Sequence, residues 1–362
     1  MKIRACNLEN FRNIEAQRLR FAADRVFLAG LNGQGKSNLL EALGLLHALR
    51  SFRTADLRHL IRRGARVARL YFEIETGGKA PETALIELRR GGGREVRVND
   101  GKVASLGDFL ARFPCLVLAA EDIQVIRGAP AQRRRLLDLH FSSSRPGYYR
   151  ALREYYRGLA ARNRLLKNDA PGDQIRAHDR PLAEAAAAVR RHRREGTDAL
   201  VPVFAESFDR ISGGLDGPAL SLRASLPDPD PGEIRRSWEA GLERDRALRS
   251  TQAGPHRDDW IFATETGDAR EYASDGQQRN LAIALKLALF RDLRASAAEE
   301  PVLLADDILG ELDPVRRRAF WNGLPADCQV IATGTEFDPS RHPGRWETYT
   351  VEGGTFEKRH DS

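Results

Sequence analysis

The sequence is poor in cysteine, and it has no long apolar run. Its 362 residues include three cysteines, far apart and unlike any metal-binding spacing, at Cys6, Cys115 and Cys328. This excludes a disulfide-stapled scaffold and a zinc-finger pattern, and predicts buried thiols in a reducing compartment. No hydrophobic stretch approaches the length of a membrane span, and residues 1–6 resemble a strand rather than a signal peptide. We therefore expect a soluble cytoplasmic protein with no membrane partner.

Lysine is also scarce, since only seven of the 58 basic residues are Lys and the rest are Arg. The net charge of +7 is unevenly distributed: residues 126–250 hold 24 basic and 17 acidic residues, and the rest of the chain holds 34 of each. Within that segment, residues 126–194 hold 17 basic and 6 acidic residues. An excess confined to one segment is typical of a surface that binds a polyanion such as DNA. A solvated helical surface in an arginine-rich protein would give the same pattern.

A glycine-rich motif lies near the N-terminus. Residues 30–37 read GLNGQGKS and fit the pattern G-x-x-x-x-G-K-[S/T], between a strand predicted at 25–29 and a helix that opens at Asn38. The glycines let successive backbone N–H groups converge on one anion, and the helix N-terminus adds partial positive charge. Lys36 would reach the β- and γ-phosphates of a nucleotide, and the Ser37 hydroxyl would hold Mg²⁺. The predicted nucleotide-contacting residues are Gly30, Leu31, Asn32, Gly33, Gln34, Gly35, Lys36, Ser37 and Asn38.

The remaining pattern divides the chain into three parts. Residues 1–120 are mainly β, with strands predicted at 67–74, 84–89, 95–98 and 115–118 and a turn at 99–101. The middle is mainly helical, with helices predicted around 152–159 and over 183–194, and a loop at 227–232. From 255 onward the α/β pattern returns, with a helix over about 276–294, strands at 302–305 and 329–332, and a helix capped by Asp313 with Pro314 at its first position.

We therefore predict an α/β fold in which a mainly helical basic arm, 126–250, is inserted between an N-terminal part, 1–125, and a C-terminal part, 251–362. Apolar and aromatic residues recur at helical spacing at Leu152, Tyr155, Tyr156 and Leu159, so we expect the tyrosines to pack between helices rather than stack on bases.

Two adjacent carboxylates, Asp306 and Asp307, follow the strand predicted at 302–305. In P-loop ATPases an acidic residue at the end of a neighbouring strand holds Mg²⁺, and a second carboxylate can orient or activate the attacking water. Adjacent side chains of a strand point to opposite sides, so the two can take separate roles. We predict Asp306 and Asp307 as catalytic residues, and Ser37 with Asp306 as the Mg²⁺ site. A solvent-facing acidic turn is the alternative interpretation.

A polar helix start, Ser274-Asp275-Gly276-Gln277, lies 32 residues before Asp306. Ser274 and Gln277 are spaced as a capping box, so an ordinary helix start would explain them. The functional interpretation is a second anion site, made from a serine hydroxyl, a flexible glycine and N–H groups at a helix N-terminus. On this interpretation Ser274, Gly276 and Gln277 contact a nucleotide.

The order of these motifs, which ends in Glu311-Leu312-Asp313, resembles the head of the ABC-type ATPases. In that group the S-x-G-Q helix of one subunit closes over ATP held by the glycine-rich loop of another. The 238 residues between Lys36 and Ser274 are typical of the SMC and RecF branch, whose members carry an inserted arm. Within that branch the chain resembles the RecF family, through residues 10–13, 30–37, 121–123, 128–134, 254–259, 274–279 and 303–307.

This resemblance implies an ATP-dependent DNA-binding protein of recombinational repair and replication-fork recovery, with ATP and Mg²⁺ as cofactors. ATP shared between two copies would make a homodimer on gapped DNA, and slow, DNA-stimulated hydrolysis would reset this switch. RecR and RecO are the implied partners, and RecA loading the implied outcome. Gly310 stands where the family usually has a serine, which would weaken communication between the two ATP sites.

The basic arm begins with Arg133, Arg134 and Arg135, which we predict to contact DNA. These arginines could instead line the dimer or ATP site, with DNA bound elsewhere on the head. His256 has no Cys or His partner at ligand spacing, so we expect it to orient a polar loop rather than to bind a metal.

The competing interpretation is a metabolic P-loop enzyme, such as a small-molecule kinase with a basic lid. Such a kinase would need neither the motif at 274–277 nor the 270 residues between Lys36 and Asp306.

Overall fold

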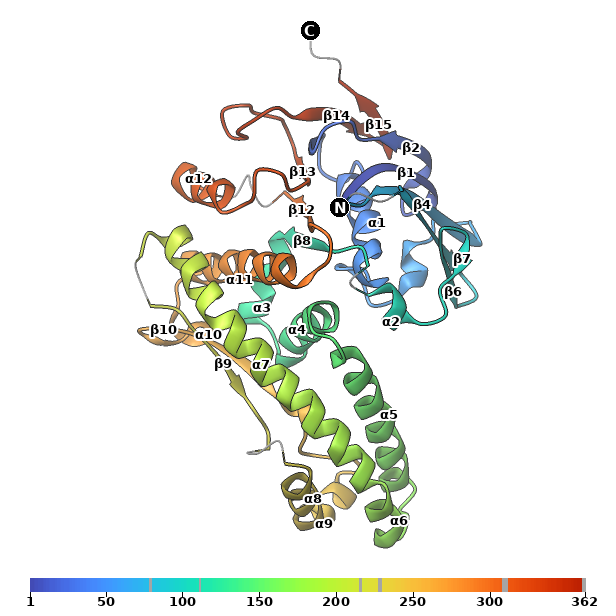
Figure 1. Ribbon diagram of the computed structural model, residues 1–362, viewed down its shortest axis with the longest axis vertical. Helices are drawn as coiled ribbons and strands as arrows, with labels where there is room; N and C mark the ends of the chain where they lie inside the picture. The colour runs from blue at the N-terminus through green and yellow to red at the C-terminus, as the bar shows by residue number, and fades with distance from the viewer. Residues whose placement is uncertain (78–79, 111, 215–216, 227–229, 308–311, 360–362) are drawn as a thin grey trace. The chain divides into compact units, whose positions relative to one another are not determined.

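The computed structural model describes residues 1–77, 80–110, 112–214, 217–226, 230–307 and 312–359 (Figure 1). The chain divides into two compact units. The head unit comprises Met1–Asp122, Arg210–Gly213 and Lys286–Ser362, and the arm unit comprises Ile123–Asp209 and Gly214–Leu285. Within the described part of the chain, no helix is both long enough and apolar enough to cross a membrane.

The first sheet of the head unit is antiparallel, with strand order β2-β1-β4-β5-β6-β7. Its strands are β1 (Lys2–Phe11), β2 (Ile14–Arg20), β4 (Val67–Glu75), β5 (Glu82–Arg89), β6 (Arg94–Val98) and β7 (Gly101–Lys102). Asn99 and Asp100 form the two-residue turn between β6 and β7 with φ of 49° and 64°. Asn and Asp tolerate this left-handed backbone, which explains the predicted turn.

The second sheet of the head unit combines strands from both ends of the chain, in the order β15-β14-β3-β13-β12-β8. Its strands are β3 (Arg25–Ala29), β8 (Cys115–Ala119), β12 (Val302–Asp306), β13 (Val330–Gly334), β14 (Glu347–Glu352) and β15 (Thr355–Lys358). The strands β14, β3, β13, β12 and β8 are parallel, and β15 pairs with β14 antiparallel. Parallel strands end at one edge of a sheet, so the segments that follow β3, β12 and β13 lie at the same edge.

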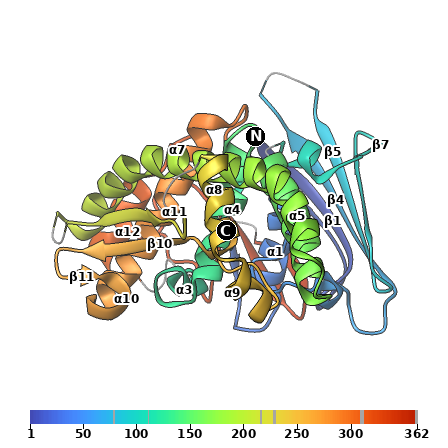
Figure 2. The ribbon, with the colours of Figure 1, turned by 90° about the horizontal axis from the view of Figure 1, so that it is seen from below.

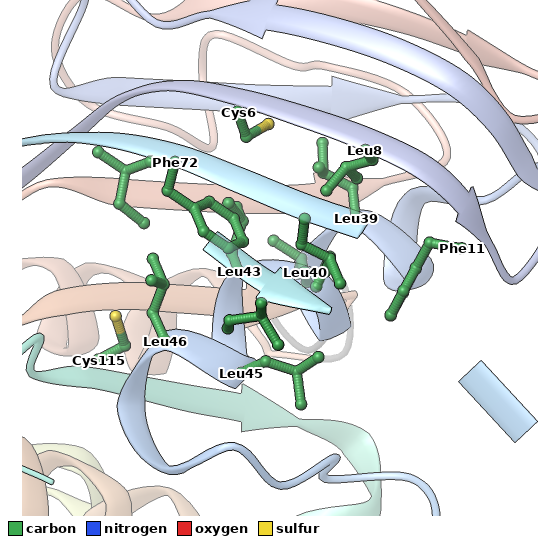
Figure 3. Close-up of a cluster of buried hydrophobic side chains, with 14 of the residues drawn as sticks. Cys6, Leu8, Phe11, Leu39, Leu40, Leu43, Leu45, Leu46, Phe72 and Cys115 are labelled. Carbon is green, nitrogen blue, oxygen red and sulfur yellow. The ribbon is translucent and has the colours of Figure 1, made fainter. Parts of the chain in front are cut away.

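Helix α1 (Lys36–Ala48) lies between the two sheets and is buried along nearly its whole length. Its leucines are fully buried on one side of the helix, at Leu39, Leu40, Leu43 and Leu46, and Leu45 is fully buried on the other side. Figure 3 shows them between Leu8 and Phe72 of the first sheet and Cys115 of the second. All three cysteines are buried, and burial raises the pKa of each thiol to about 12, so they are packing residues as predicted.

The arm unit is mainly helical. Its elements are α3 (Gln124–Arg127), α4 (Pro130–Ser144), α5 (Tyr148–Lys167), α6 (Gly172–Ala177), α7 (Asp179–Ser212), β9 (Ala219–Arg223), α8 (Pro231–Ala240), α9 (Leu242–Ala247), η3 (Pro255–Arg257), β10 (Asp259–Thr264), β11 (Gly267–Asp268), α10 (Ala269–Tyr272) and α11 (Asp275–Ser296). The last residues of α7 and the second half of α11, from Lys286 onward, belong to the head unit. The head unit also holds η1 (Leu57–Leu60), α2 (Leu106–Phe109) and α12 (Pro314–Asn322), and η2 (Ala120–Ile123) crosses the boundary between the units.

Helices α5 and α7 run side by side, with β9, β10 and β11 forming a sheet against α7 (Figures 1 and 2). Trp260 of β10 anchors that sheet by donating a hydrogen bond from its indole N–H to the Thr197 hydroxyl at 2.8 Å. Arg162, on α5, is fully buried and pairs with Asp179 at 2.8 Å and Asp245 at 2.6 Å. A charge this deeply buried is tolerated because it is paired on both sides.

The α/β fold with an inserted helical arm agrees with the sequence prediction, but three details differ. The helix predicted at 183–194 is part of the 34-residue α7, which continues past Pro202. The loop predicted at 227–232 ends earlier than predicted, because Asp230 caps α8 and Pro231 occupies the first turn of that helix. Residues 227–229 of this loop lie outside the described residues. The arm unit extends to Leu285 rather than to the predicted 250, since β10 pairs with β9.

Candidate nucleotide-binding site

The loop that follows β3 is held closely against the second sheet. The backbone N–H of Gly30 donates to the Gly334 carbonyl of β13 at 3.2 Å. A Cβ atom at position 30 would lie 2.4 Å from the Val351 carbonyl oxygen, so only glycine fits there. Gly33 and Gly35 have φ of 81° and 115°, which glycine adopts without strain. The glycines predicted from the motif are therefore required by the backbone path.

Lys36 is the first residue of α1 and is 5% exposed. Its Nζ donates to the carbonyl oxygens of Gly30 at 2.7 Å and Leu31 at 2.9 Å, so the loop curls around the ammonium group. Burial lowers the pKa of Lys36, and the carboxylates of Asp307 and Asp306 oppose that shift. Helix α1 has no side-chain cap and no acidic residue in its first turn. Its N-terminal N–H groups and a buried cation together suit a phosphate.

Ser37 and Asp306 lie together, as predicted. The Ser37 hydroxyl donates to Asp306 Oδ1 at 2.8 Å, and the Thr333 hydroxyl donates to the same oxygen at 2.9 Å. Burial raises the pKa of Asp306 above its ordinary value, and these two hydrogen bonds oppose the shift. A hydroxyl and a carboxylate at the end of a strand are the hard oxygen ligands that Mg²⁺ prefers, so the residues present fit that ion.

Asp307 follows β12 in a left-handed conformation, with φ of 52°. The strand ends at Asp306, so the side-chain alternation that predicted separate directions for the two carboxylates does not extend to Asp307. The backbone N–H of Asp307 donates to the Thr333 hydroxyl oxygen at 3.0 Å. Such a conformation costs a non-glycine residue about 1–2 kcal/mol and indicates a constraint set by the surroundings.

Two residues of the segment 10–13 support the glycine-rich loop and helix α1, although the glycine-rich motif itself gave them no role. Asn13 donates to the Gln34 carbonyl at 3.1 Å and accepts from the Asn38 amide at 2.8 Å. Arg12 makes a bidentate ion pair with the fully buried Glu41, at 2.9 and 2.8 Å. Glu41 interrupts the otherwise apolar stretch 39–46 of α1, which is the sequence signal for a buried partner.

Arg53 is a further residue near the site that sequence reasoning missed. Its guanidinium donates to Asn38 Oδ1 at 2.9 Å, and its charge opposes the rise that burial causes in the pKa of Asp306. Nothing in the local sequence distinguishes Arg53 from the many other arginines of the chain.

The predicted second anion site, Ser274 to Gln277, lies in the arm unit at the start of α11. The capping box forms: the Ser274 N–H donates to Gln277 Oε1 at 2.8 Å, and the Gln277 N–H donates to Ser274 Oγ at 3.3 Å. Ser274 and Gly276 are exposed, and a Cβ atom at position 276 would meet nothing within 4 Å. Packing against the residues that the structure describes therefore gives no reason for a glycine there.

The DNA prediction for Arg133 needs correction. Arg133 is 4% exposed and makes a bidentate pair with Asp259, at 2.7 and 3.0 Å, while its remaining nitrogen bonds to backbone carbonyls, including that of Gly128. A guanidinium that is buried and paired in this way is a structural group of the arm and does not face a phosphate. Arg134 is half-buried and donates to the Asp258 carbonyl at 2.7 Å, and Arg135 is exposed.

The stretch 254–259 that carries part of the family resemblance is largely internal. His256 accepts from or donates to the Tyr155 hydroxyl at 2.6 Å and contacts the Thr251 carbonyl at 2.9 Å through its other ring nitrogen. Burial lowers the pKa of His256. Asp258 is fully buried and pairs with Arg193 at 3.1 Å. His256 thus orients a polar loop, as expected from its sequence context.

Two tyrosines on α5 and the aspartate before α12 take local structural positions in the two units. Tyr155 is buried between helices as predicted, whereas Tyr156 is 41% exposed. Asp313 caps α12 by accepting from the N–H groups of Val315 and Arg316, both at 2.9 Å. Gly310 and Glu311 lie outside the described residues.

Comparison with known proteins places this geometry in context. The family described as the RecF/RecN/SMC N terminal domain matches residues 2–336. A protein of Synechococcus sp. (strain JA-3-3Ab) named DNA replication and repair protein RecF is 35% identical over 99% of this chain and 96% of its own length. The protein of the same name from Heliobacterium modesticaldum is 32% identical over the whole of both chains.

Solved structures agree. One of the recombination mediator protein RecF with ATP, in the RecFOR pathway, superposes with a TM-score of 0.92 at 28% identity, covering 99% of this chain and 98% of the other. A second, of RecF with ATPrS, has a TM-score of 0.89 at 29% identity, covering 98% and 97%. An SMC head bound to the winged-helix domain of ScpA has a TM-score of 0.58 at 15% identity, covering 99% and 97%, and shows the fold alone.

Proposed function

This chain belongs to the RecF family of DNA replication and repair proteins, and from that premise we propose that it is an ATP-controlled DNA-binding switch of recombinational repair and replication-fork recovery. ATP binding would join two copies on gapped DNA, and slow, DNA-stimulated hydrolysis would release them. The observation that carries the proposal is the arrangement of Lys36, Ser37 and Asp306 at one sheet edge.

The chain's own groups suit binding of ATP with Mg²⁺. The N–H groups of residues 33–38 and the Lys36 ammonium would hold the phosphates, and Ser37 with Asp306 would hold the Mg²⁺, which supplies charge neutralisation when bound. Asp307 would orient the attacking water, because its carboxylate lies close enough to the Lys36 ammonium to oppose the lowering of the Lys36 pKa by burial.

The second half of the site would come from another copy of the chain. Ser274, Gly276 and Gln277 of that copy would cover the nucleotide, with the exposed Ser274 hydroxyl and the bare backbone at Gly276 against the phosphates. A glycine for which the isolated chain shows no packing reason is what a close approach by a ligand would require.

DNA would meet the exposed basic side of the arm. Arg153 and Arg157 on α5 are exposed and have no ion pair among the described residues, and Tyr156 lies between them with 41% of its surface exposed. Arg135 would extend this surface from α4. Exposed guanidinium groups can neutralise phosphates without breaking a buried contact, whereas Arg133 would have to leave its buried pair with Asp259 to do so. RecR and RecO would be partners of the DNA-bound form, and loading of RecA its outcome.

Sedimentation with and without ATP and Mg²⁺ tests the switch. The wild type is expected to change from monomer to dimer, and Ser274→Arg is expected to stay monomeric while still binding a fluorescent ATP analogue. Lys36→Ala should weaken binding of that analogue about 10- to 100-fold, since it removes a charge-assisted contact to phosphate. A wild type that remains monomeric in ATP, or that binds ATP as well without Lys36, would overturn the proposal. A metabolic kinase would remain monomeric and turn over a small acceptor.

A further inference from the structure

The end of β13 contacts both the glycine-rich loop and the acidic pair of the phosphate site in the head unit. Thr333 and Gly334 are the last residues of this strand, which lies between β3 and β12 in the sheet. The Gly334 carbonyl accepts from the Gly30 N–H at the start of the glycine-rich loop. The Thr333 side chain contacts the acidic pair on the other side.

The Thr333 hydroxyl makes two hydrogen bonds of opposite sense. It donates its proton to Asp306 Oδ1 at 2.9 Å and accepts the backbone N–H of Asp307 at 3.0 Å. Thr333 is 2% exposed, so solvent does not replace these bonds easily. One hydroxyl thus fixes the rotamer of one carboxylate and the left-handed backbone of the next.

We infer that Thr333 is a positioning residue, which holds Asp306 for the metal ion and Asp307 for water. This inference rests on the proposed function, because it assigns a role within the same ATP site. The directions of the two hydrogen bonds support this role, because the hydroxyl donates to the Asp306 carboxylate and its lone pair accepts the Asp307 N–H. Among side chains of this size, only threonine and serine carry a hydroxyl that can do both.

The alternative is that Thr333 only packs in the sheet. Valine has the shape and the strand preference of threonine but neither hydrogen bond, and serine keeps the hydroxyl while losing the methyl group. Thr333→Val and Thr333→Ser therefore separate packing from positioning.

The test measures binding of a fluorescent ATP analogue in excess Mg²⁺ and in EDTA. The ratio of the affinity in Mg²⁺ to the affinity in EDTA, called here the Mg²⁺ gain, reports how well the protein holds the metal ion with the nucleotide. Loss of a group that orients a metal ligand typically weakens metal binding about 10- to 100-fold, so Thr333→Val should lose that much of the Mg²⁺ gain. Its affinity in EDTA should stay that of the wild type, because Lys36 and the loop are unchanged. Thr333→Ser should keep the gain.

A Thr333→Val protein that keeps the full Mg²⁺ gain overturns the inference. A purely structural role would instead lower the melting temperature and the EDTA affinity together, and serine would not restore them. If the valine variant does not fold, Thr333→Ala removes the hydroxyl without adding bulk and allows the same comparison. A wild type whose ATP binding does not depend on Lys36 would instead count against the proposed function, so the two failures are distinguishable.

Discussion

Replacing Arg133 with alanine should destabilise the arm unit without acting on DNA directly. The substitution leaves Asp259, which is 3% exposed, without its bidentate partner. Removing one member of a buried ion pair costs about 3–5 kcal/mol. Asp259 keeps a contact to the exposed Arg223 at 3.3 Å and accepts the Trp260 N–H at 2.9 Å, so we expect the lower end, about 3 kcal/mol.

Urea unfolding followed by tryptophan fluorescence measures this change, because Trp238 and Trp260 are both buried in the arm unit. With a slope of about 1–3 kcal/mol per molar urea, the midpoint should fall by roughly 1 M or more. Arg135→Ala is the matched control on the same helix: it is exposed, and its cost should stay within about 0.5 kcal/mol.

The double variant Arg133→Met with Asp259→Leu should recover much of the lost stability, since replacing a buried pair by apolar groups is often neutral. The reasoning would be refuted if Arg133→Ala unfolded at the wild-type urea concentration while its affinity for DNA fell and the salt dependence of binding flattened. That result would mean that Arg133 leaves its buried site to contact phosphate.

Three further outcomes are expected. Gly276→Ala should stabilise α11 slightly, by up to about 1 kcal/mol, yet weaken ATP-driven dimerisation in sedimentation; equal dimerisation would argue against a close approach at this residue. Burial lowers the pKa of His256 in the folded state, so the folded protein binds fewer protons than the unfolded protein. The stability from this residue is therefore fully present above the ordinary pKa of 6.5 and is lost as the pH falls towards the lower folded pKa. Urea unfolding above and below pH 6.5 should show a smaller loss of stability for His256→Asn than for the wild type. Replacing Arg153 and Arg157 together by glutamine should lower the slope of log affinity for DNA against log salt by about two, and an unchanged slope would place the DNA elsewhere.

The phosphate cradle could be predicted from sequence because its determinants are local. Gly30 to Ser37 have a fixed spacing between a strand and a helix, and Asp306 follows a short apolar strand. The contact of Ser37 with Asp306 then follows, because parallel strands end at one edge of a sheet. The fold class followed from the same alternation of strands and helices.

Residues whose roles depend on distant partners could not be predicted in this way. Arg133 and Arg135 stand in the same basic run, and nothing local shows that one pairs with Asp259, 126 residues later, while the other is exposed. Thr333 gives no signal either, because threonine at the end of a strand is common. Its role depends on β13 lying beside β12, which the order of strands along the chain does not reveal.

The pairing of β3 with β13 and β14 has a consequence for the synthesis of the protein. Strand β3 is made first, but its sheet partners are translated about 300 residues later. Until the last part of the chain has left the ribosome, β3 has two unpaired edges, and the loop after it lacks the Gly334 carbonyl that holds Gly30. The head unit should therefore complete its fold after translation ends, and nascent chains that stop before β13 should expose aggregation-prone edges and lack a formed phosphate site.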